Sequence, residues 1–391
     1  MTGIDIPEGS LFSLDNLPYG IFSTEGTEPR VGVRVGDTVL DLSRVFEDDV
    51  VFVEPSLNAF MAQGRRRWSE VRSAIKEYVV GEVAADAVFD IGEVTLHLPI
   101  EVADYVDFYA SEVHATNLGR LFRPQNPDPL MPNWKHMPVA YHGRSSTVVP
   151  SGVDIVRPSG QRKDPNDSAP VFGPSTRLDI EAEIGFVVGV GSPMGSQIKP
   201  DDFAEHCFGL VILNDWSARD IQAWEYVPLG PNLGKSFATS ISPWVVPLAA
   251  LDAARIDTPV QVPEPLPYLR GGEKWGLDID LAIEWNGHIV SRPPYAQMYW
   301  SPAQMLAHIA VNGAATRTGD LFGSGAISGR EKDQRGAFIE LTWGGAEPVR
   351  IGGELRTYLE DGDEIVMSAT APGPNGSRIG FGEVRGRIMG S

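Results

Sequence analysis

Two carboxylates that share one face of a strand could hold a divalent metal ion. Glu181 and Glu183 alternate with apolar residues in the stretch DIEAEI. Residues two apart in a strand share a face, so both side chains are expected to point the same way. The apolar run FVV that follows predicts a strand that enters the interior, where two like charges are costly without a cation between them. A lone pair of alternating acids is also typical of a solvated strand face.

Asp215 follows an uncharged run, Phe208–Leu213, that predicts a buried strand. The side chain would then emerge at the edge of a core, where a carboxylate needs a partner and a metal ion can be one. An Asn-Asp pair after a strand is also typical of an ordinary turn.

A fourth acid and a histidine come from a predicted helix over Asp107 to Leu121. In it, Asp107, Ser111 and His114 follow the i, i+4, i+7 spacing of one helical face. Four oxygen ligands suit Ca²⁺ or Mg²⁺ and offer no soft donor for zinc or copper. They are Asp107, Glu181, Glu183 and Asp215. His114 would then be free to act as a base, although a lone histidine is more often a core or surface residue.

The elements around these residues predict a mixed, β-dominated α+β protein of two domains. Residues 1–98 contain a hairpin pattern around Gly36 and a helical pattern from Ser56 to Tyr78, and gather no catalytic residue types. Residues 99–391 are rich in Gly, Pro and short β-like runs, and Phe338–Leu341 is one of these runs. Helical patterns are too sparse there for a doubly wound sheet.

Composition excludes several classes of partner. The 391 residues carry a formal net charge of −20, which opposes binding to nucleic acid or to an anionic membrane. The single cysteine, Cys207, cannot form an internal disulfide. No basic, apolar leader begins the chain and no continuous apolar run reaches the ~18 residues of a membrane span. We therefore expect a cytoplasmic protein with no membrane partner.

Four segments in the same order resemble the fumarylacetoacetase family. They are DFYASEVHATNLGRLFR, MPVAYHGRSSTVVPSG, FGPSTRLDIEAEIGFVVG and NDWSARDIQAWEYVPLGPNLGKSFATSISPW, and GSGAISG adds a later match. The resemblance implies a small N-terminal SH3-like β-barrel (residues 1–98), a large C-terminal mixed β-roll (residues 99–391) and a homodimer. It also implies metal-dependent hydrolysis of a carbon–carbon bond in the diketo acid 4-fumarylacetoacetate, giving fumarate and acetoacetate, which closes tyrosine and phenylalanine breakdown.

The resemblance assigns roles to individual residues. The metal ligands it implies are the four acids already named, with Ca²⁺ or Mg²⁺ as the ion. Lys235 and Thr239 match positions around a possible second, structural Mg²⁺ beside Asp215. The implied catalytic residues are His114 as base, Glu340 as its orienting carboxylate, and Arg219, Gln222 and Lys235 around the oxyanion. The implied substrate contacts are Tyr109, Arg123, Tyr141, Gln222, Tyr226 and the position of Ala326.

Two departures and several alternatives accompany this assignment. Ala326 stands where vertebrate members usually show a threonine that touches substrate, and the loop from Arg123 to Tyr141 is one residue longer. Arg219 is close enough in sequence to Asp215 and Asp220 to be a plain ion-pair partner. A related hydrolase or decarboxylase acting on an acylpyruvate or another 2,4-dioxo acid is the alternative function. A catalytically silent metal-binding protein is a second alternative.

Overall fold

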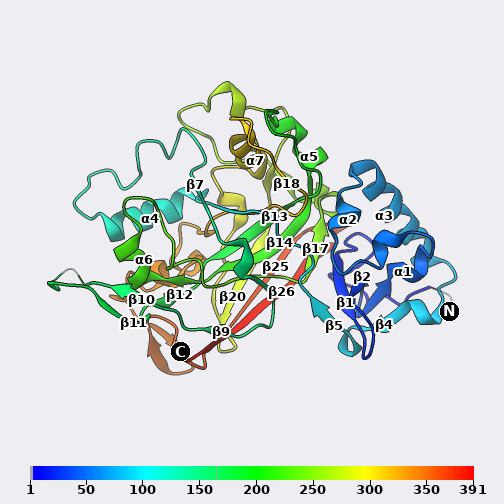
Figure 1. The fold of residues 1–391 in the computed structure, drawn as a ribbon, viewed down its shortest axis with the longest axis horizontal. Coiled ribbons are helices and arrows are strands. Elements are labelled where there is room, and N and C mark those ends of the chain that lie inside the picture. Colours follow the sequence, from blue (N-terminus) through cyan, green and yellow to red (C-terminus); the bar gives the residue numbers. More distant parts are fainter. Residues whose placement is uncertain (1–2, 165) are drawn as a thin grey trace.

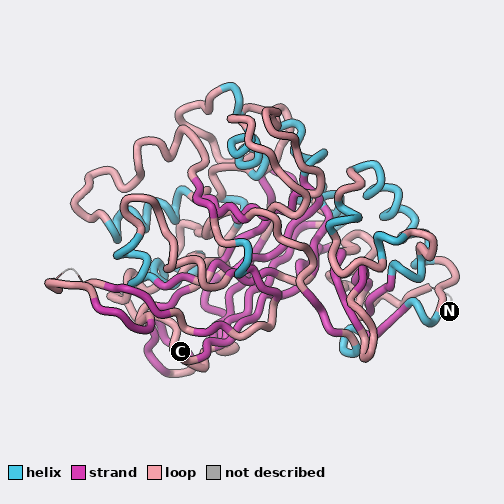
Figure 2. Tube along the Cα trace, viewed as in Figure 1, coloured by secondary structure: helices cyan, strands magenta, loops and turns pink. Residues whose placement is uncertain are grey.

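Strands dominate the computed structural model, which describes residues 3–164 and 166–391 (Figure 2). A smaller part, formed by the N-terminal residues, packs against one side of a large strand-rich part (Figure 1). The mixed, β-dominated architecture predicted from the sequence is confirmed.

The N-terminal part is an antiparallel sheet with helices on it. Gly36, at φ 57°, turns the chain between β2 and β3, as the hairpin pattern predicts. The bounds are β1 (Tyr19–Ser23), β2 (Arg30–Val35), β3 (Thr38–Asp41), β4 (Val88–Asp90), β5 (Thr95–His97), α1 (Leu42–Val45), α2 (Asn58–Met61) and α3 (Arg65–Val80). The strands pair in the order β4-β3-β2-β1, with β5 also on β1. Among the described residues no pairing joins β4 to β5, so the closed SH3-like barrel is not confirmed.

The single helix expected over Ser56 to Tyr78 is in fact two helices, α2 and α3. Gly64 separates them at φ 84°, a left-handed conformation that interrupts a helix. The apolar spacing still places Val71 and Ile75 in the core.

The N-terminal sheet continues into the large part, because β1 pairs with β17. The joined sheet runs β4-β3-β2-β1-β17-β14-β13-β22-β6-β7, with β16 on β14 and β8 on β16. The bounds are β6 (Tyr105–Phe108), β7 (Ala140–His142), β8 (Val148–Pro150), β13 (Ala182–Val188), β14 (Cys207–Asp215), β16 (Thr239–Ile241), β17 (Trp244–Pro247) and β22 (Leu321–Gly323).

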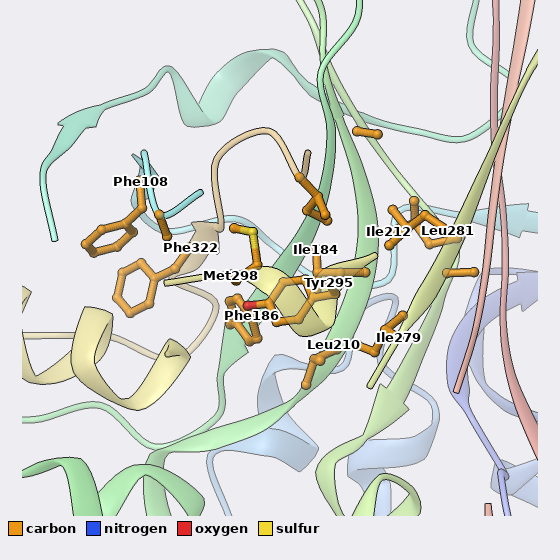
Figure 3. Packing of buried hydrophobic residues seen from close by; sticks show 14 of the residues in the cluster. Phe108, Ile184, Phe186, Leu210, Ile212, Ile279, Leu281, Tyr295, Met298 and Phe322 are labelled. Carbon is orange, nitrogen blue, oxygen red and sulfur yellow. The ribbon is translucent and has the colours of Figure 1, made fainter. Parts of the chain in front are cut away.

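A second sheet, in the order β21-β20-β25-β26-β9, covers one face of β13 and β14. Leu210 lies beside Ile279, and Ile212 lies beside Leu281, in this interface (Figure 3). The bounds are β9 (Ile155–Val156), β20 (Asp280–Trp285), β21 (His288–Ser291), β25 (Glu364–Pro372) and β26 (Arg378–Met389).

Strand β14 is buried on both faces, which explains the absence of charged residues from Phe208 to Leu213. Leu210 and Ile212 belong to the core of the large part, whereas Val211 and Leu213 belong to the core shared with the N-terminal part. Every residue of β13 and β14 is buried. Two layers of core therefore fix the strands that carry Glu183 and Asp215.

The remaining elements are short pieces around these sheets. The strands are β10 (Ser159–Arg162), β11 (Val171–Pro174), β12 (Leu178–Asp179), β15 (Ser217–Ala218), β18 (Arg255–Ile256), β19 (Gly276–Leu277), β23 (Val349–Ile351) and β24 (Glu354–Arg356). The helices are α4 (Glu112–Phe122), α5 (Phe203–His206), α6 (Arg219–Glu225), α7 (Pro302–Ala310) and α8 (Phe338–Leu341). Across the described part of the chain, every helix is too short or too polar to cross a bilayer.

Candidate active site and metal centre

Strand pairing brings the four predicted acids to one point. Glu181 lies just before β13, Glu183 lies in β13, and Asp215 ends the neighbouring strand β14. Asp107 joins them through β22, because Gly323 of that strand pairs with Gly185 on one side and with Asp107 on the other. One oxygen from each carboxylate lies within 4.8 Å of the others, and all four residues are buried.

The helical placement of Asp107 is wrong. Asp107 lies in strand β6, and the helix begins only at Glu112, with Ser111 as its N-cap. The Ser111 hydroxyl accepts from the backbone N–H of His114 at 3.2 Å. Asp107 and His114 therefore reach the site from a strand and a helix rather than from one helical face.

Two cations neutralise one side of the acidic cluster. Lys235 Nζ lies 2.6 Å from Glu181 Oε2 and 2.5 Å from Asp215 Oδ2. Arg219 Nη2 lies 2.7 Å from Glu181 Oε1. Burial alone would raise the pKa of Glu181, but the charges of Lys235 and Arg219 lower it below its usual range. Glu181 is therefore held ionised by the protein itself.

The other side of the cluster lacks such compensation. Burial, followed by the charges of neighbouring acids, raises the pKa of Asp107 and Glu183 well above the usual range. Asp107 Oδ1 and Glu183 Oε1 are buried without a hydrogen-bond partner among the described residues. Buried carboxylate oxygens without donors are the ligands that a hard cation requires, so the cluster could bind a metal ion.

The backbone leaves room at these oxygens. Glu183 Oε2 accepts from the backbone N–H of Gly325 at 2.9 Å. A Cβ on Gly323 would stand 2.7 Å from Glu183 Oε2 and 3.1 Å from Asp107 Oδ1. The absence of a side chain at Gly323 therefore lets these two carboxylates approach the sheet.

Asp215 has two further neighbours. The Tyr141 hydroxyl donates to Asp215 Oδ2 at 3.1 Å, and Thr239 Oγ1 lies 3.4 Å from Asp215 Oδ1. Burial is the first cause that raises the pKa of Asp215, and Lys235 opposes it.

His114 and Glu340 form a buried pair beside the acids. His114 Nδ1 lies 2.6 Å from Glu340 Oε2, and His114 Nε2 lies 3.6 Å from Glu181 Oε1. Burial alone would raise the pKa of Glu340, but His114, Asn117 and Ser328 together lower it. An ionised carboxylate can only accept, so Nδ1 carries the proton and Nε2 of the neutral ring keeps its lone pair.

Glu340 is fixed by groups that the sequence does not single out. Asn117 Nδ2 donates to Glu340 Oε1 at 2.8 Å, and Ser328 Oγ donates to Glu340 Oε2 at 2.7 Å.

The strand predicted over Phe338–Leu341 is wrong, because these residues form the short helix α8.

Asp179 links helix α8 to Arg219. Its carboxylate is fully buried and accepts from Arg219 Nε at 2.8 Å and from the backbone N–H groups of Phe338 at 2.7 Å and Ile339 at 2.9 Å. The backbone N–H of Ile180 donates to it as well, at 2.7 Å. One carboxylate thus positions a cation of the site and the helix that carries Glu340. The alternating acids Asp179, Glu181 and Glu183 were the sequence signal that could have indicated a role for Asp179.

A cavity of about 320 Å³ opens beside Asp107 and Glu181, whereas Glu183 and Asp215 lie behind them and do not line it. Arg219 Nη1 donates to Gln222 Oε1 at 3.1 Å, so the amide NH₂ of Gln222 remains unused by that contact. The predicted site residues that line the cavity are Asp107, Tyr109, His114, Arg123, Tyr141, Glu181, Arg219, Gln222, Tyr226 and Lys235. Ala326 is buried and does not line it. The site combines an acidic cluster, a buried histidine and several cationic or amide donors beside one open space.

Comparison with known proteins agrees along the whole chain. The family model "Fumarylacetoacetase N-terminal" matches residues 15–99, and "Fumarylacetoacetate (FAA) hydrolase C-terminal" matches residues 105–389. Fumarylacetoacetases of Rattus norvegicus and Homo sapiens are each 44% identical over 415 residues, covering 100% of this chain and 99% of the relative. That of Arabidopsis thaliana is 43% identical and covers 99% and 98%.

Solved structures share the fold at much lower identity. A fumarylacetoacetate hydrolase from Exiguobacterium antarcticum matches with a TM-score of 0.58 at 17% identity, covering 96% of this chain and 100% of the other. A maleylpyruvate hydrolase from Sphingobium matches with a TM-score of 0.56 at 13% identity, with the same coverage.

Proposed function

The chain belongs to the fumarylacetoacetase family, and on this premise we infer that it is a hydrolase that splits a carbon–carbon bond of 4-fumarylacetoacetate into fumarate and acetoacetate. The identity of 44% over the full length favours this substrate over the acylpyruvates or other dioxo acids of the alternative. Structures named for other substrates resemble the chain at only 13–17% identity and support the fold alone.

We propose that Asp107, Glu181, Glu183 and Asp215 hold a divalent cation, Ca²⁺ or Mg²⁺. The observation that supports this is the pair of buried, partnerless oxygens on Asp107 and Glu183 within the cluster. When bound, such an ion supplies Lewis-acid polarisation of the two diketone oxygens and stabilises the enolate that leaves. A second, structural Mg²⁺ beside Asp215, near Lys235 and Thr239, belongs to the same proposal.

His114 is the proposed base. Glu340 holds Nδ1–H, so Nε2 takes a proton from water as the water oxygen forms its bond to the attacked carbonyl carbon. The imidazolium that results is steadied by Glu340, whose lowered pKa keeps it ionised. When the carbon–carbon bond breaks, its electron pair stays on the departing carbon, and the proton held by His114 can neutralise that carbon.

Arg219, Gln222 and Lys235 are proposed to meet the oxyanion of the tetrahedral intermediate. Arg219 is anchored by Asp179, Gln222 accepts from Arg219 through Oε1 and not through its amide NH₂, and the Lys235 ammonium has three N–H groups for its two carboxylate contacts. Donors fixed in advance in this way cost no reorganisation during the reaction, and losing one typically costs about 3–4 kcal/mol of barrier.

Arg123 and the tyrosines Tyr109, Tyr141 and Tyr226 are proposed to bind the carboxylate ends of the substrate. All four line the cavity, where a guanidinium and hydroxyls suit carboxylate oxygens. Ala326 does not line the cavity, so a substrate contact at that position is either absent or made by backbone.

We also propose that the chain forms a homodimer in the cytoplasm. Apolar side chains are exposed on the large part, with Phe172 at 78% and Leu229 at 96%. Burying them against a second copy would remove that apolar surface from water. Light scattering of the purified protein tests this, and a monomeric mass at micromolar concentration would contradict it.

The observation that carries the proposed mechanism is the buried contact of His114 with Glu340, beside the unpaired oxygens Asp107 Oδ1 and Glu183 Oε1. The test follows the loss of the diketone's ultraviolet absorbance with and without a chelator, in wild type and in His114→Asn. Asn can still donate to Glu340 but cannot accept a proton, so kcat should fall by about 10²–10⁴-fold.

The matched control is His308→Asn, which changes a half-buried histidine bonded to Tyr268, outside the cavity. The control should keep wild-type kcat. Full turnover by His114→Asn would refute the base, and full turnover in chelator would refute the metal. Turnover of acylpyruvates in preference to fumarylacetoacetate would favour the alternative substrate class.

A further inference from the structure

We propose that Tyr105 is a positioning residue of the metal centre, whose hydroxyl donates to Asp107 or Glu183 when these carboxylates bind a divalent ion. The inference rests on the metal site proposed above. Tyr105 lies in β6 two residues before Asp107, so both side chains lie on the same face of the strand. In the pairing of β6 with β22, Tyr105 is opposite Leu321 and Asp107 is opposite Gly323.

The ring of Tyr105 is fixed in the core shared by the two parts of the molecule. Its side chain is 3% exposed and belongs to the same cluster as Val211 and Leu213 of β14. The backbone of Gly143 packs directly on the ring, since a Cβ there would stand only 2.2 Å from Tyr105 Cδ1. The hydroxyl therefore cannot turn toward solvent without disrupting this packing.

Gly323 leaves a small gap that three oxygens border. A Cβ at this position would stand 2.7 Å from Glu183 Oε2, 3.1 Å from Asp107 Oδ1 and 3.4 Å from the Tyr105 hydroxyl. No side chain therefore separates the hydroxyl from the two carboxylates. Rotation of either carboxylate toward this gap brings an acceptor oxygen closer to the hydroxyl.

The Tyr105 hydroxyl is a buried donor without an acceptor. It is almost inaccessible to water and makes no hydrogen bond to the described residues. Burial, followed by the charges of Asp107, Asp215 and Glu183, raises its pKa well above the usual range, and the nearby Thr239 hydroxyl opposes this shift. The phenol therefore keeps its proton. A protonated hydroxyl next to carboxylates is a donor, and an unpaired buried donor costs stability.

The cations of the site do not hold the same two carboxylates. Lys235 contacts Glu181 and Asp215, and Arg219 contacts Glu181, but among the described residues neither forms an ion pair with Asp107 or Glu183. A carboxylate that binds an ion is ionised and keeps lone pairs for a hydrogen bond from outside. Tyr105 is placed to supply that bond. Loss of such a bond typically lowers metal affinity by about 10–100-fold.

The test measures metal binding to the full chain after treatment with a chelator. Isothermal titration calorimetry with Ca²⁺, and separately with Mg²⁺, should give saturable binding to wild type. Tyr105→Phe keeps the ring and removes the hydroxyl, so the Kd for the ion should rise by about 10–100-fold. At a saturating concentration of the ion, kcat should stay within about threefold of wild type, because His114 and the oxyanion donors are unchanged.

Tyr19→Phe is the matched control. Tyr19 is 1% exposed, and its hydroxyl also makes no hydrogen bond to the described residues. It lies on β1, where the nearby charge is that of Arg72 rather than that of the acids. Tyr19→Phe should therefore bind both ions with the Kd of wild type.

Stability without metal separates a positioning role from a structural one. Because the hydroxyl is unpaired in the metal-free chain, metal-free Tyr105→Phe should melt at or above the temperature of wild type. Added Ca²⁺ should raise its melting temperature less than that of wild type, because the variant binds the ion more weakly. A metal-free melting temperature several degrees below wild type would mean that the hydroxyl already has a partner, and would overturn the proposal.

The calorimetry also distinguishes failure of this inference from failure of the metal site. Saturable binding to wild type with an equal Kd for Tyr105→Phe would overturn the role of Tyr105 and leave the metal site in place. Absence of binding of either ion to wild type would overturn the metal site, and the role of Tyr105 with it.

Discussion

Replacing Asp179 by Asn removes a charge and one acceptor oxygen from the carboxylate that joins Arg219 to helix α8. The four buried N–H groups that donate to it need two acceptor oxygens, and an amide supplies only one. Two donors would then face an NH₂ group. At about 1–3 kcal/mol for each unpaired buried donor, the free energy of unfolding should fall by about 2–6 kcal/mol.

The same substitution should also lower the kcat of the molecules that remain folded. Arg219 loses the anion that holds Nε, and α8 loses the contact that places Glu340, so kcat should fall by about 10²–10³-fold while the protein is still folded. The measurement combines a denaturant titration with fumarylacetoacetate turnover at a temperature where circular dichroism shows the variant to be native.

Asp363→Asn is the matched control for this prediction. Asp363 is also buried, and it accepts from Asn286 Nδ2 and from the backbone N–H of Glu360, each at 2.8 Å, outside the cavity. It should lose stability and keep kcat. The reasoning is refuted if Asp179→Asn keeps kcat within about threefold of wild type, or if both variants lose turnover equally.

Four further predictions concern the metal site and the cysteine. Gly323→Ala places a Cβ against Glu183 and Asp107, so metal affinity by calorimetry should fall at least tenfold, whereas Gly272→Ala, whose Cβ meets nothing, should bind metal normally. Because the pKa values of Asp107 and Glu183 are raised in the metal-free chain, metal binding should release protons, and metal affinity should increase as pH rises. Calorimetry in buffers of different ionisation enthalpy measures the number of protons released. A value of zero would contradict the prediction. Burial raises the pKa of Cys207 to about 12, so only on the order of one thiol in ten thousand is ionised at pH ~8, and iodoacetamide should label the native chain far more slowly than the unfolded chain. The unfolded thiol ionises near pH ~8.5 and the folded one does not, so the contribution of Cys207 to the free energy of unfolding is lost as pH rises above ~8.5. Cys207→Ala removes the thiol and should therefore reduce the pH dependence of the free energy of unfolding above that pH.

The acids were predictable because strand alternation is a local property. Glu181 and Glu183 are two residues apart, and Asp215 ends an uncharged run, so their positions follow from short-range pattern alone. The position of Asp107 does not, because β6 is a strand through its parallel pairing with β22, more than two hundred residues later. The helical spacing of Asp107, Ser111 and His114 is therefore a coincidence, because the helix begins after its N-cap Ser111 and Asp107 lies before it in a strand.

Helix α8 shows the same limit at shorter range. FIEL is a brief apolar run that fits a strand or a helix equally well. The choice is made by Asp179, whose carboxylate accepts from the first N–H groups of α8, and by Gly344 and Gly345, whose positive φ angles follow the helix. Asn117 and Ser328 could not be recognised from spacing, because only tertiary packing brings them to Glu340.

The charges of the site differ among the four acids in a way that points to a divalent ion. Lys235 and Arg219 both contact Glu181, Lys235 also contacts Asp215, and Arg219 is shared with Asp179. The two cations therefore face five carboxylates. The raised pKa values of Asp107 and Glu183 show that the negative charges of these two acids are the ones left without full compensation by Lys235 and Arg219. An ion of charge +2 beside these two side chains would bring the buried group close to neutrality. A monovalent ion would leave about two buried negative charges, which is why the hardest test of the site is its selectivity for Ca²⁺ or Mg²⁺ over Na⁺ in calorimetry.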